Sequence, residues 1–426
     1  MTAAVSVSSV LIGCEDDTKP DYWVEKLDDP KWRPRAVKRL TQFLDDALGR
    51  ADNNHEDPAV LELEQKLVEP LTKVYVESYD DLDTKTRVTL IKLLADFRDE
   101  KTIPALKAAF DHFAKRPRKT KDEADIKWAV RAYGDMKSKE LAPSVLAAFK
   151  KLKASTPLGM STYRDYSKAM VAAPSDTWTD ELIDMLKVEM KHPRTGKTKQ
   201  QIADLRAPFM DQQFWQVTAA QVLGAIKDPK AVDPLIEQIV DPAKGAVGTT
   251  AILALVKIGE PSVTRASKLF NEDDPMVDYA KKAIKKATDA KEEPKGNPIV
   301  GQAAAIIGVT GRADGVAPLL KALQGKLSDE EKTLIARELP KLPVTDEAKA
   351  AFKKTFESIS LDSTVNGTPA LVILAESSAQ FYEPGMIDWM LERARKTRGS
   401  GDAKIGLQQT LATSALKLAG PKEWDK

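Results

Sequence analysis

The chain has 426 residues, and 65 Lys and Arg against 64 Asp and Glu leave a formal net charge of +1. That length requires two or three globular domains or one extended repeat array, and 42% hydrophobic with 30% charged residues excludes a disordered or a membrane-embedded chain. The near-zero charge argues against a dedicated nucleic-acid binder, and one Cys with three His leaves little for a disulfide framework or a metal centre.

The N-terminal stretch ends at the single cysteine of the sequence. Residues 1–13 carry no charge and include a short apolar segment, far below the roughly 20 residues that span a bilayer. Residues 11–14 read Leu-Ile-Gly-Cys, and the acidic residues 15–17 follow. This stretch resembles a bacterial lipoprotein signal, in which an aliphatic residue, a variable residue and a small residue precede a Cys that becomes lipidated.

The resemblance implies that residues 1–13 are a signal peptide, that Cys14 carries the lipid, and that residues 14–21 form an acidic tether. Sorting in many such bacteria retains a lipoprotein at the inner membrane when Asp follows the Cys. This chain has Glu15 there, so the resemblance implies an outer membrane lipoprotein facing the periplasm or the exterior. Because no Lys or Arg precedes the apolar segment, a cytosolic protein with an incidental cysteine stays open as the alternative.

A proline motif recurs along the body of the chain, where apolar residues from about residue 22 onward have helical spacing. An aliphatic residue, one further residue, Pro and two aliphatic residues occur at 232–236 and 316–320, with prolines 84 positions apart, twice 42. Residues 103–106 and 141–146 repeat the theme with prolines 39 positions apart. Proline suits the first turn of a helix, where its missing N–H would be unpaired anyway, so each motif predicts a helix start.

A second signature is Asp or Asn followed by Pro. It predicts the start of the first helix of a repeat, because the polar side chain caps the helix and Pro fits its first turn. It occurs at Asp29-Pro30, Asp241-Pro242, Asp274-Pro275 and Asn297-Pro298.

In their order and spacing these signatures resemble HEAT repeats, whose units have an Asp-Pro start, an Ala-rich first helix, a polar turn and an aliphatic second helix. The resemblance covers about residues 22–420 and is clearest at 84–150 and 212–325. It implies an all-α fold, an alpha-alpha superhelix or HEAT-like solenoid of roughly eight to ten helix pairs over residues 22–426. Ordinary helical bundles with similar helix starts are the alternative.

Two polar stretches interrupt the repeats. One lies at residues 191–213 and contains Pro193, Gly196 and Pro208, and we expect it to be an insertion that projects from one face. The other, at residues 291–296, is expected to be a joint within the array.

We find no catalytic constellation. Residues 195–198 read Thr-Gly-Lys-Thr, the end of a phosphate-loop motif, but Lys191 takes the place of the leading Gly. No long apolar helix is expected directly after it, which favours a flexible basic loop. His55, His112 and His192 are far apart in the sequence and outside any His-Glu-x-x-His pattern. We therefore expect no catalytic residue, no metal and no cofactor.

Aromatic side chains around the expected insertion are the candidates for binding a partner, because aromatic residues are enriched at interface hot spots. The six candidates are Tyr163, Tyr166, Trp178, Phe209, Phe214 and Trp215. Packing in the helical core is the alternative explanation for them.

Together these features predict a lipid-anchored scaffold or adaptor of the bacterial envelope that is not an enzyme. It would hold an envelope protein along the solenoid surface, reach the membrane through Cys14, and bind no nucleic acid. One alternative is an enzyme that resembles HEAT-like phycobilin lyases or DNA glycosylases, which a bound coloured or nucleotide ligand would favour. The other is a cytosolic protein-binding scaffold, if residues 1–13 are no signal.

Overall fold

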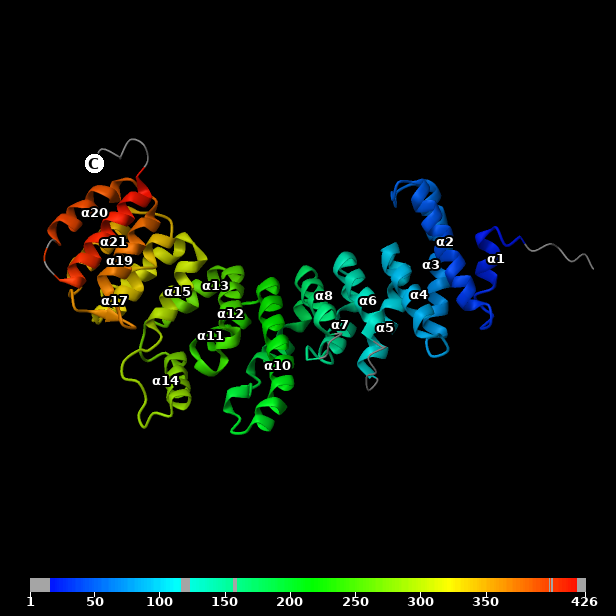
Figure 1. Cartoon of the computed structure of the whole chain (residues 1–426), viewed down its shortest axis with the longest axis horizontal. Coiled ribbons are helices and arrows are strands. Elements are labelled where there is room, and N and C mark those ends of the chain that lie inside the picture. Colours follow the sequence, from blue (N-terminus) through cyan, green and yellow to red (C-terminus); the bar gives the residue numbers. More distant parts are fainter. Residues whose placement is uncertain (1–15, 116–122, 156–158, 398, 400, 420–426) are drawn as a thin grey trace, which may run out of the picture. The chain divides into compact units, whose positions relative to one another are not determined.

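The computed structural model describes residues 16–115, 123–155, 159–397, 399 and 401–419 (Figure 1). The described residues form the α-helices α1 to α21, several short 3₁₀ turns and one β-hairpin whose strands have two residues each. The all-α fold is therefore confirmed. Cys14 and residues 1–13 lie outside the described residues. The chain divides into two compact units, Met1–Ser175 and Asp176–Lys426.

The first unit stacks its helices in two layers. Helices α2, α4, α6 and α8 contact one another in succession in one layer, and α3, α5 and α7 do so in the other. The core lies between the layers, where Leu90 of α4 and Phe110 of α5 are fully buried. The bounds are α1 Pro20–Glu25, α2 Arg33–Arg50, α3 Pro58–Glu77, α4 Thr84–Phe97, α5 Ile103–Lys115, α6 Glu123–Met136, α7 Ala142–Phe149 and α8 Gly159–Ala172.

The second unit repeats this plan with more helices. Helices α10, α12, α15, α17, α19 and α21 follow one another in one layer, and the second layer contains the successions α9–α11–α13 and α16–α18. Helix α14 packs against α11, and α20 packs against α21. The bounds are α9 Thr179–Lys187, α10 Lys199–Ile226, α11 Val232–Val240, α12 Gly245–Ile258, α13 Glu260–Lys268, α14 Pro275–Thr288, α15 Val300–Thr310, α16 Val316–Ala322, α17 Asp329–Ala336, α18 Asp346–Ser358, α19 Ala370–Ser378, α20 Gly385–Lys396 and α21 Asp402–Leu418.

The proline motifs mark helix starts, as the sequence predicts. Pro104, Pro143, Pro234 and Pro318 each lie in the first turn of a second-layer helix, namely α5, α7, α11 and α16. A 3₁₀ turn precedes each of these four helices: η1 (Glu100–Thr102), η3 (Lys139–Leu141), η6 (Pro229–Ala231) and η8 (Ala313–Gly315).

The repeat period inferred from Pro234 and Pro318 is wrong. A further second-layer helix, α13, begins between them with Pro261 in its first turn, 27 positions after Pro234 and 57 positions before Pro318. The spacing of 84 is therefore one short repeat plus one long repeat. The long repeat holds the additional helix α14 and the non-helical segment 289–299, which includes the predicted joint at 291–296.

The Asp-Pro signature begins some helices and not others. Asp274 caps α14 by accepting a hydrogen bond from the Met276 N–H (2.9 Å), as predicted. Asp29 does not cap α2, which begins at Arg33 with Trp32 as its N-cap residue. The reason is local: the Asp29 carboxylate accepts from the Lys31 N–H (2.8 Å) and closes a separate turn before the helix.

Residues 191–213 are largely helical. After the turn η5 (Pro193–Thr195), a capping box between Thr198 and Gln201 starts α10, which continues through Pro208 to Ile226. A long helix thus follows residues 195–198, but its first half is polar and exposed rather than apolar. Pro208 is tolerated because it lies in the exposed half of α10, where water can bind the carbonyl group that Pro leaves unpaired.

A β-hairpin that the sequence analysis did not identify joins α18 to α19. Strands β1 (Thr364–Val365) and β2 (Thr368–Pro369) pair antiparallel, with Val365 opposite Thr368. Asn366 and Gly367 both have positive φ, 50° and 80°, as a two-residue type I′ turn requires.

Among the described residues, no single helix is long and apolar enough to cross a membrane; one bent pair, Pro229–Val240 with Pro242–Ile258, meets the test of length and composition together, with a bend of 94°.

Candidate protein-binding site

The six predicted aromatic residues divide into core and surface positions. Tyr166, Trp178 and Phe214 are buried in the helical core. The Tyr166 ring, for example, packs with Phe110 and Phe149, both at a centroid distance of 6.3 Å. These three side chains present almost no surface to a partner, so core packing accounts for them and the prediction of a contact role is corrected.

Tyr163, Phe209 and Trp215 are half-buried, and their partner-binding role stays a prediction. Tyr163 belongs to the first unit, and the other two lie on α10 of the second. The Phe209 ring meets the ring of His192 edge to face at 4.8 Å, so part of its surface is covered by the turn before α10.

The three histidines have separate neighbours. The His55 Nδ1 atom lies 3.1 Å from the Glu64 carboxylate, His112 stacks on Tyr79 with centroids 3.7 Å apart, and His192 contacts Phe209. Within the described ranges of the chain, no group of three or more His, Cys, Asp or Glu side chains is placed to hold a metal ion.

A buried polar cluster ties the helices of the first unit together. Asp125 of α6 pairs with Arg87 of α4, and the Tyr75 hydroxyl of α3 donates to the same carboxylate oxygen (3.1 Å). Arg87 also lies over the Tyr79 ring, 4.8 Å from its centroid. Burial raises the pKa of the Asp125 carboxyl, and the bonds from Arg87 and Tyr75 oppose that rise.

This cluster is structural. All of its members are buried in the core, and the Asp125 side chain is 1% exposed. A buried ion pair of this kind fixes how neighbouring helices sit against each other, because separating the charges would leave one unpaired in a nonpolar interior.

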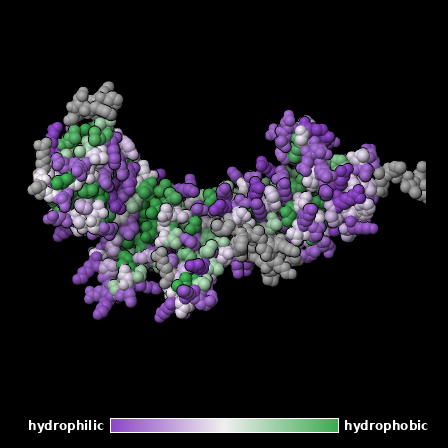
Figure 2. Space-filling model, viewed as in Figure 1, coloured by the Kyte–Doolittle hydropathy of each residue, from purple (hydrophilic) through white to green (hydrophobic). Residues whose placement is uncertain are grey.

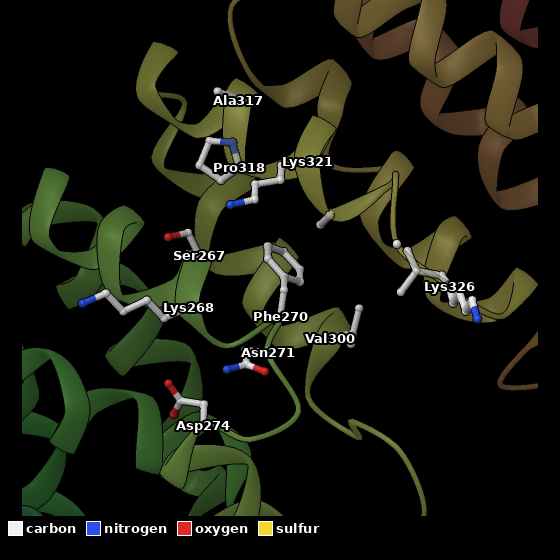
Figure 3. Close-up of a pocket in the computed structure, with 13 residues that line it drawn as sticks. Ser267, Lys268, Phe270, Asn271, Asp274, Val300, Ala317, Pro318, Lys321 and Lys326 are labelled. Carbon is white, nitrogen blue, oxygen red and sulfur yellow. The ribbon is translucent and has the colours of Figure 1, made fainter.

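A cavity of the second unit lies between α13 and α16, and we call it the α13–α16 groove. It is open to solvent and has a volume of about 900 Å³, within the range of about 300–1,000 Å³ typical of ligand pockets. Figure 3 shows its lining, which comes from α13, the turn after α13, the start of α15, α16 and the segment after α16. The lining residues are Ser267, Lys268, Phe270, Asn271, Asp274, Val300, Ala317, Pro318, Lys321, Ala322, Gly325, Lys326 and Leu327.

The groove exists because α14 leaves the second layer. Instead of filling the space between α13 and α16, α14 packs beside α11, where the Tyr279 hydroxyl donates to Asp241 (2.9 Å) and Lys286 pairs with Glu189 (3.0 Å). The segment 289–299 then returns the chain to α15. Because α14 packs elsewhere, α13 and α16, which are successive helices of the second layer, have an open groove between them.

The groove is positively charged. Lys268, Lys321 and Lys326 line it, and the one acidic lining residue, Asp274, is neutralised by a bidentate pair with Arg265, with both N···O distances 2.9 Å. Burial by itself would raise the pKa of Asp274, but the bonds from Arg265 and the Met276 N–H lower it below its usual value. Asp274 is therefore a permanent partner of Arg265 at neutral pH.

Apolar surface accompanies this charge. In Figure 3 the half-buried ring of Phe270 lies between α13 and α16, with Pro318 on the opposite wall. In the space-filling view of Figure 2, hydrophobic residues gather over the part of the second unit that contains α13 and α15. The groove thus combines an apolar floor with cationic side chains, a combination suited to a polypeptide with both kinds of side chain.

Sequence analysis missed the residues of the groove. Phe270 and the three lysines follow no spacing rule, because they meet only when α14 is displaced. A signal did exist: the polar break at 291–296, together with a third Pro-marked helix start at Pro261, indicated an extra element in this repeat.

Comparison with known proteins supports the repeat assignment. A family model described as HEAT repeats matches residues 212–285, which extend from α10 to α14. No curated protein matches the chain. A solved structure titled as an engineered protein aligns with 94% of this chain and 99% of its own at 17% sequence identity, with a TM-score of 0.30, which is too low to carry an argument.

The family match and the two-layered helical units agree. Residues 212–285 match HEAT repeats within an all-α helical-repeat architecture, an architecture that presents long surfaces.

Proposed function

We propose that the chain is a non-catalytic scaffold that binds a protein partner along its helical repeats and is held by a lipid at the bacterial envelope. The observation that carries the binding role is the HEAT-repeat architecture with an open groove of about 900 Å³ between α13 and α16. Stacked helix pairs supply long surfaces rather than an enclosed reaction chamber, which favours a polypeptide ligand.

The envelope location rests on the sequence of residues 11–14, which lies outside the described residues. A lipid on Cys14 would hold the chain at the outer membrane, with Glu15 as the sorting residue. Replacing the acceptor tests this: Cys14→Ser should move the protein from the membrane fraction to the soluble fraction, whereas Ser9→Ala, in the same stretch, should leave it membrane-bound. Unchanged fractionation of the Cys14→Ser variant would contradict the anchor and favour the cytosolic scaffold.

The non-catalytic role is supported by the helical-repeat scaffold. A tightly bound chromophore or nucleotide in the purified chain would contradict this role and favour an enzyme of the phycobilin-lyase or DNA-glycosylase type.

The partner is sought by cross-linking in the host, followed by affinity purification of the chain from the membrane fraction. We expect one envelope protein in comparable amount. Recovery of no protein in stoichiometric amount would contradict the scaffold. Phe214 is not a suitable position for a contact variant, because its burial means that a change there would test folding.

A further inference from the structure

We propose that the α13–α16 groove binds an extended acidic segment of the partner that carries an apolar side chain. This inference rests on the scaffold function proposed above and adds the place and chemistry of the contact. It follows from three properties of the groove: its apolar floor, its uncompensated lysines and the way these lysines are spread along it.

The apolar floor supplies the anchor point. Phe270, Pro318 and Leu327 are all half-buried, so each keeps apolar surface that a ligand side chain can cover. Covering such surface contributes roughly 25 cal/mol per Å² removed from water. An aromatic side chain within a concave site is also the type of residue that dominates binding energy at protein interfaces.

In the part of the chain that the structure describes, none of the three lysines forms a direct ion pair, although the charge of Lys268 helps to lower the pKa of Asp274. Neighbouring lysines do form such pairs: Lys281 pairs with Glu272 (3.1 Å) and Lys332 with Asp329 (3.7 Å). Lys268, Lys321 and Lys326 are exposed around the groove instead. Their charges are therefore available to a ligand.

The helix ends do not cancel this charge. Lys268 and Lys321 lie in the last turns of α13 and α16, whose carbonyl ends each act as about half a negative charge. Two such ends offset about one of the three lysine charges, and Arg265 is shared between Asp274 and Asp233, which leaves about one negative charge on that group. The groove therefore retains roughly one positive charge, which complements carboxylates and repels a basic segment.

The arrangement of the lysines favours an extended ligand over a compact anion. In the view of Figure 3, Lys268 and Lys326 lie toward opposite sides of the groove, with Lys321 between them. Their ammonium groups do not converge on one point, as they would around a phosphate. Acidic side chains spaced along a peptide can meet them one after another while an apolar side chain covers Phe270.

The test is selection from a random dodecapeptide phage library on the immobilised full chain, followed by affinity measurement with the selected peptides. We expect the selected peptides to combine two or more acidic residues with a neighbouring apolar residue. Their affinity should fall at least about tenfold in the double variant Lys268→Glu/Lys321→Glu, and should weaken as salt shortens the screening length.

The matched control is Lys257→Glu/Lys417→Glu. Lys257 and Lys417 are also exposed lysines in the last turns of helices in the second unit, but they lie in the other layer. This double variant should bind the selected peptides like the unaltered chain. If the two double variants unfold at the same temperature, a loss of binding in the Lys268→Glu/Lys321→Glu variant comes from the changed groove and not from misfolding.

Two results would overturn the inference: selected peptides without the acidic and apolar pattern, or peptides whose affinity survives the reversal of Lys268 and Lys321. The scaffold function is judged separately by the envelope cross-linking. A partner that is recovered equally well with the groove variant would leave the scaffold standing and place the contact elsewhere, whereas absence of any partner would remove the scaffold itself.

Discussion

The second helix layers of the two units differ in how two successive helices pack. In the first unit, α5 packs directly against α7, and the Ser144 hydroxyl of α7 donates to Asp111 of α5 (2.8 Å). In the second unit, α13 and α16 are separated by a groove, because α14 and the segment 289–299 lie between them in the sequence and α14 packs beside α11. An inserted helix can thus leave an open groove where two helices of a repeat protein would otherwise pack together.

The polar groups of the two regions differ in the same way. The charges of Asp125 and Arg87 pair with each other inside the first unit, whereas Lys268, Lys321 and Lys326 surround an open groove in the second. Buried charge must be paired to be tolerated, and exposed charge can be kept for a partner. The comparison predicts that changes in the first region affect stability, and that changes in the second affect binding.

The largest effect is expected at Asp125. Asp125→Ala should lower the free energy of unfolding by about 3–5 kcal/mol, because it leaves the Arg87 charge buried without its partner. Urea denaturation followed by circular dichroism measures this. The double variant Arg87→Met/Asp125→Leu should recover most of the loss, and an equal loss in both variants would contradict the ion-pair explanation.

A loss of binding without a loss of stability is expected at Phe270. Phe270→Ala should weaken the selected acidic peptides by about tenfold or more, since truncation of an aromatic hot-spot residue typically costs at least 1–2 kcal/mol. Fluorescence anisotropy with a labelled peptide measures the affinity. Tyr382→Ala, at an exposed aromatic of the second unit outside the groove lining, should leave this affinity unchanged; a similar loss there would show that the effect is not local.

A smaller, pH-dependent effect is expected at Asp274. Its pKa is lowered in the folded chain, so its carboxylate contributes stability above its ordinary pKa of about 3.9 and loses that contribution as the pH falls through the lower folded value. Asp274→Asn keeps a good N-cap residue and removes the charge, so it should cost about 1 kcal/mol or less at pH 7. Thermal unfolding should show the difference shrinking toward pH 2, and a difference that grows in acid would contradict the assignment.

The most local effect, similar in size to that at Asp274, is expected at the start of α10. Thr198→Ala removes the hydroxyl that accepts from the Gln201 N–H and should cost about 1 kcal/mol, confined to the exposed half of the helix. Amide hydrogen exchange should become faster at residues 199–211 and stay unchanged in α11. Faster exchange throughout the second unit would contradict the expectation that the exposed half of α10 opens independently of the rest of the unit.

How far the sequence predicts the structure depends on the range of the interactions involved. The first turns of α5, α7, α11 and α16 follow from Pro and its aliphatic neighbours, which act within one turn. The period of 42 fails because two unequal repeats sum to the same distance between Pro234 and Pro318, and no local rule distinguishes them.

The candidate site was harder to predict for a related reason. Aromatic residues near a polar stretch are equally suited to core and surface, and tertiary packing placed Tyr166, Trp178 and Phe214 inside. The α13–α16 groove depends on where α14 packs, which is set by contacts such as the one from Tyr279 to Asp241, 38 positions apart. Such long-range contacts decide the site, and the spacing of residues within one helix does not contain them.

The most direct test of the account is site-specific photo-cross-linking in the host, with p-benzoylphenylalanine placed either at Ala317 or at Leu253. Ala317 is an exposed residue of the groove, and Leu253 is exposed on α12 of the other layer. The account predicts one cross-linked partner from position 317, lost in the Lys268→Glu/Lys321→Glu variant, and none from position 253. Cross-linking from position 253 alone, or cross-linking at position 317 that persists in the variant, would contradict the α13–α16 groove as the contact site.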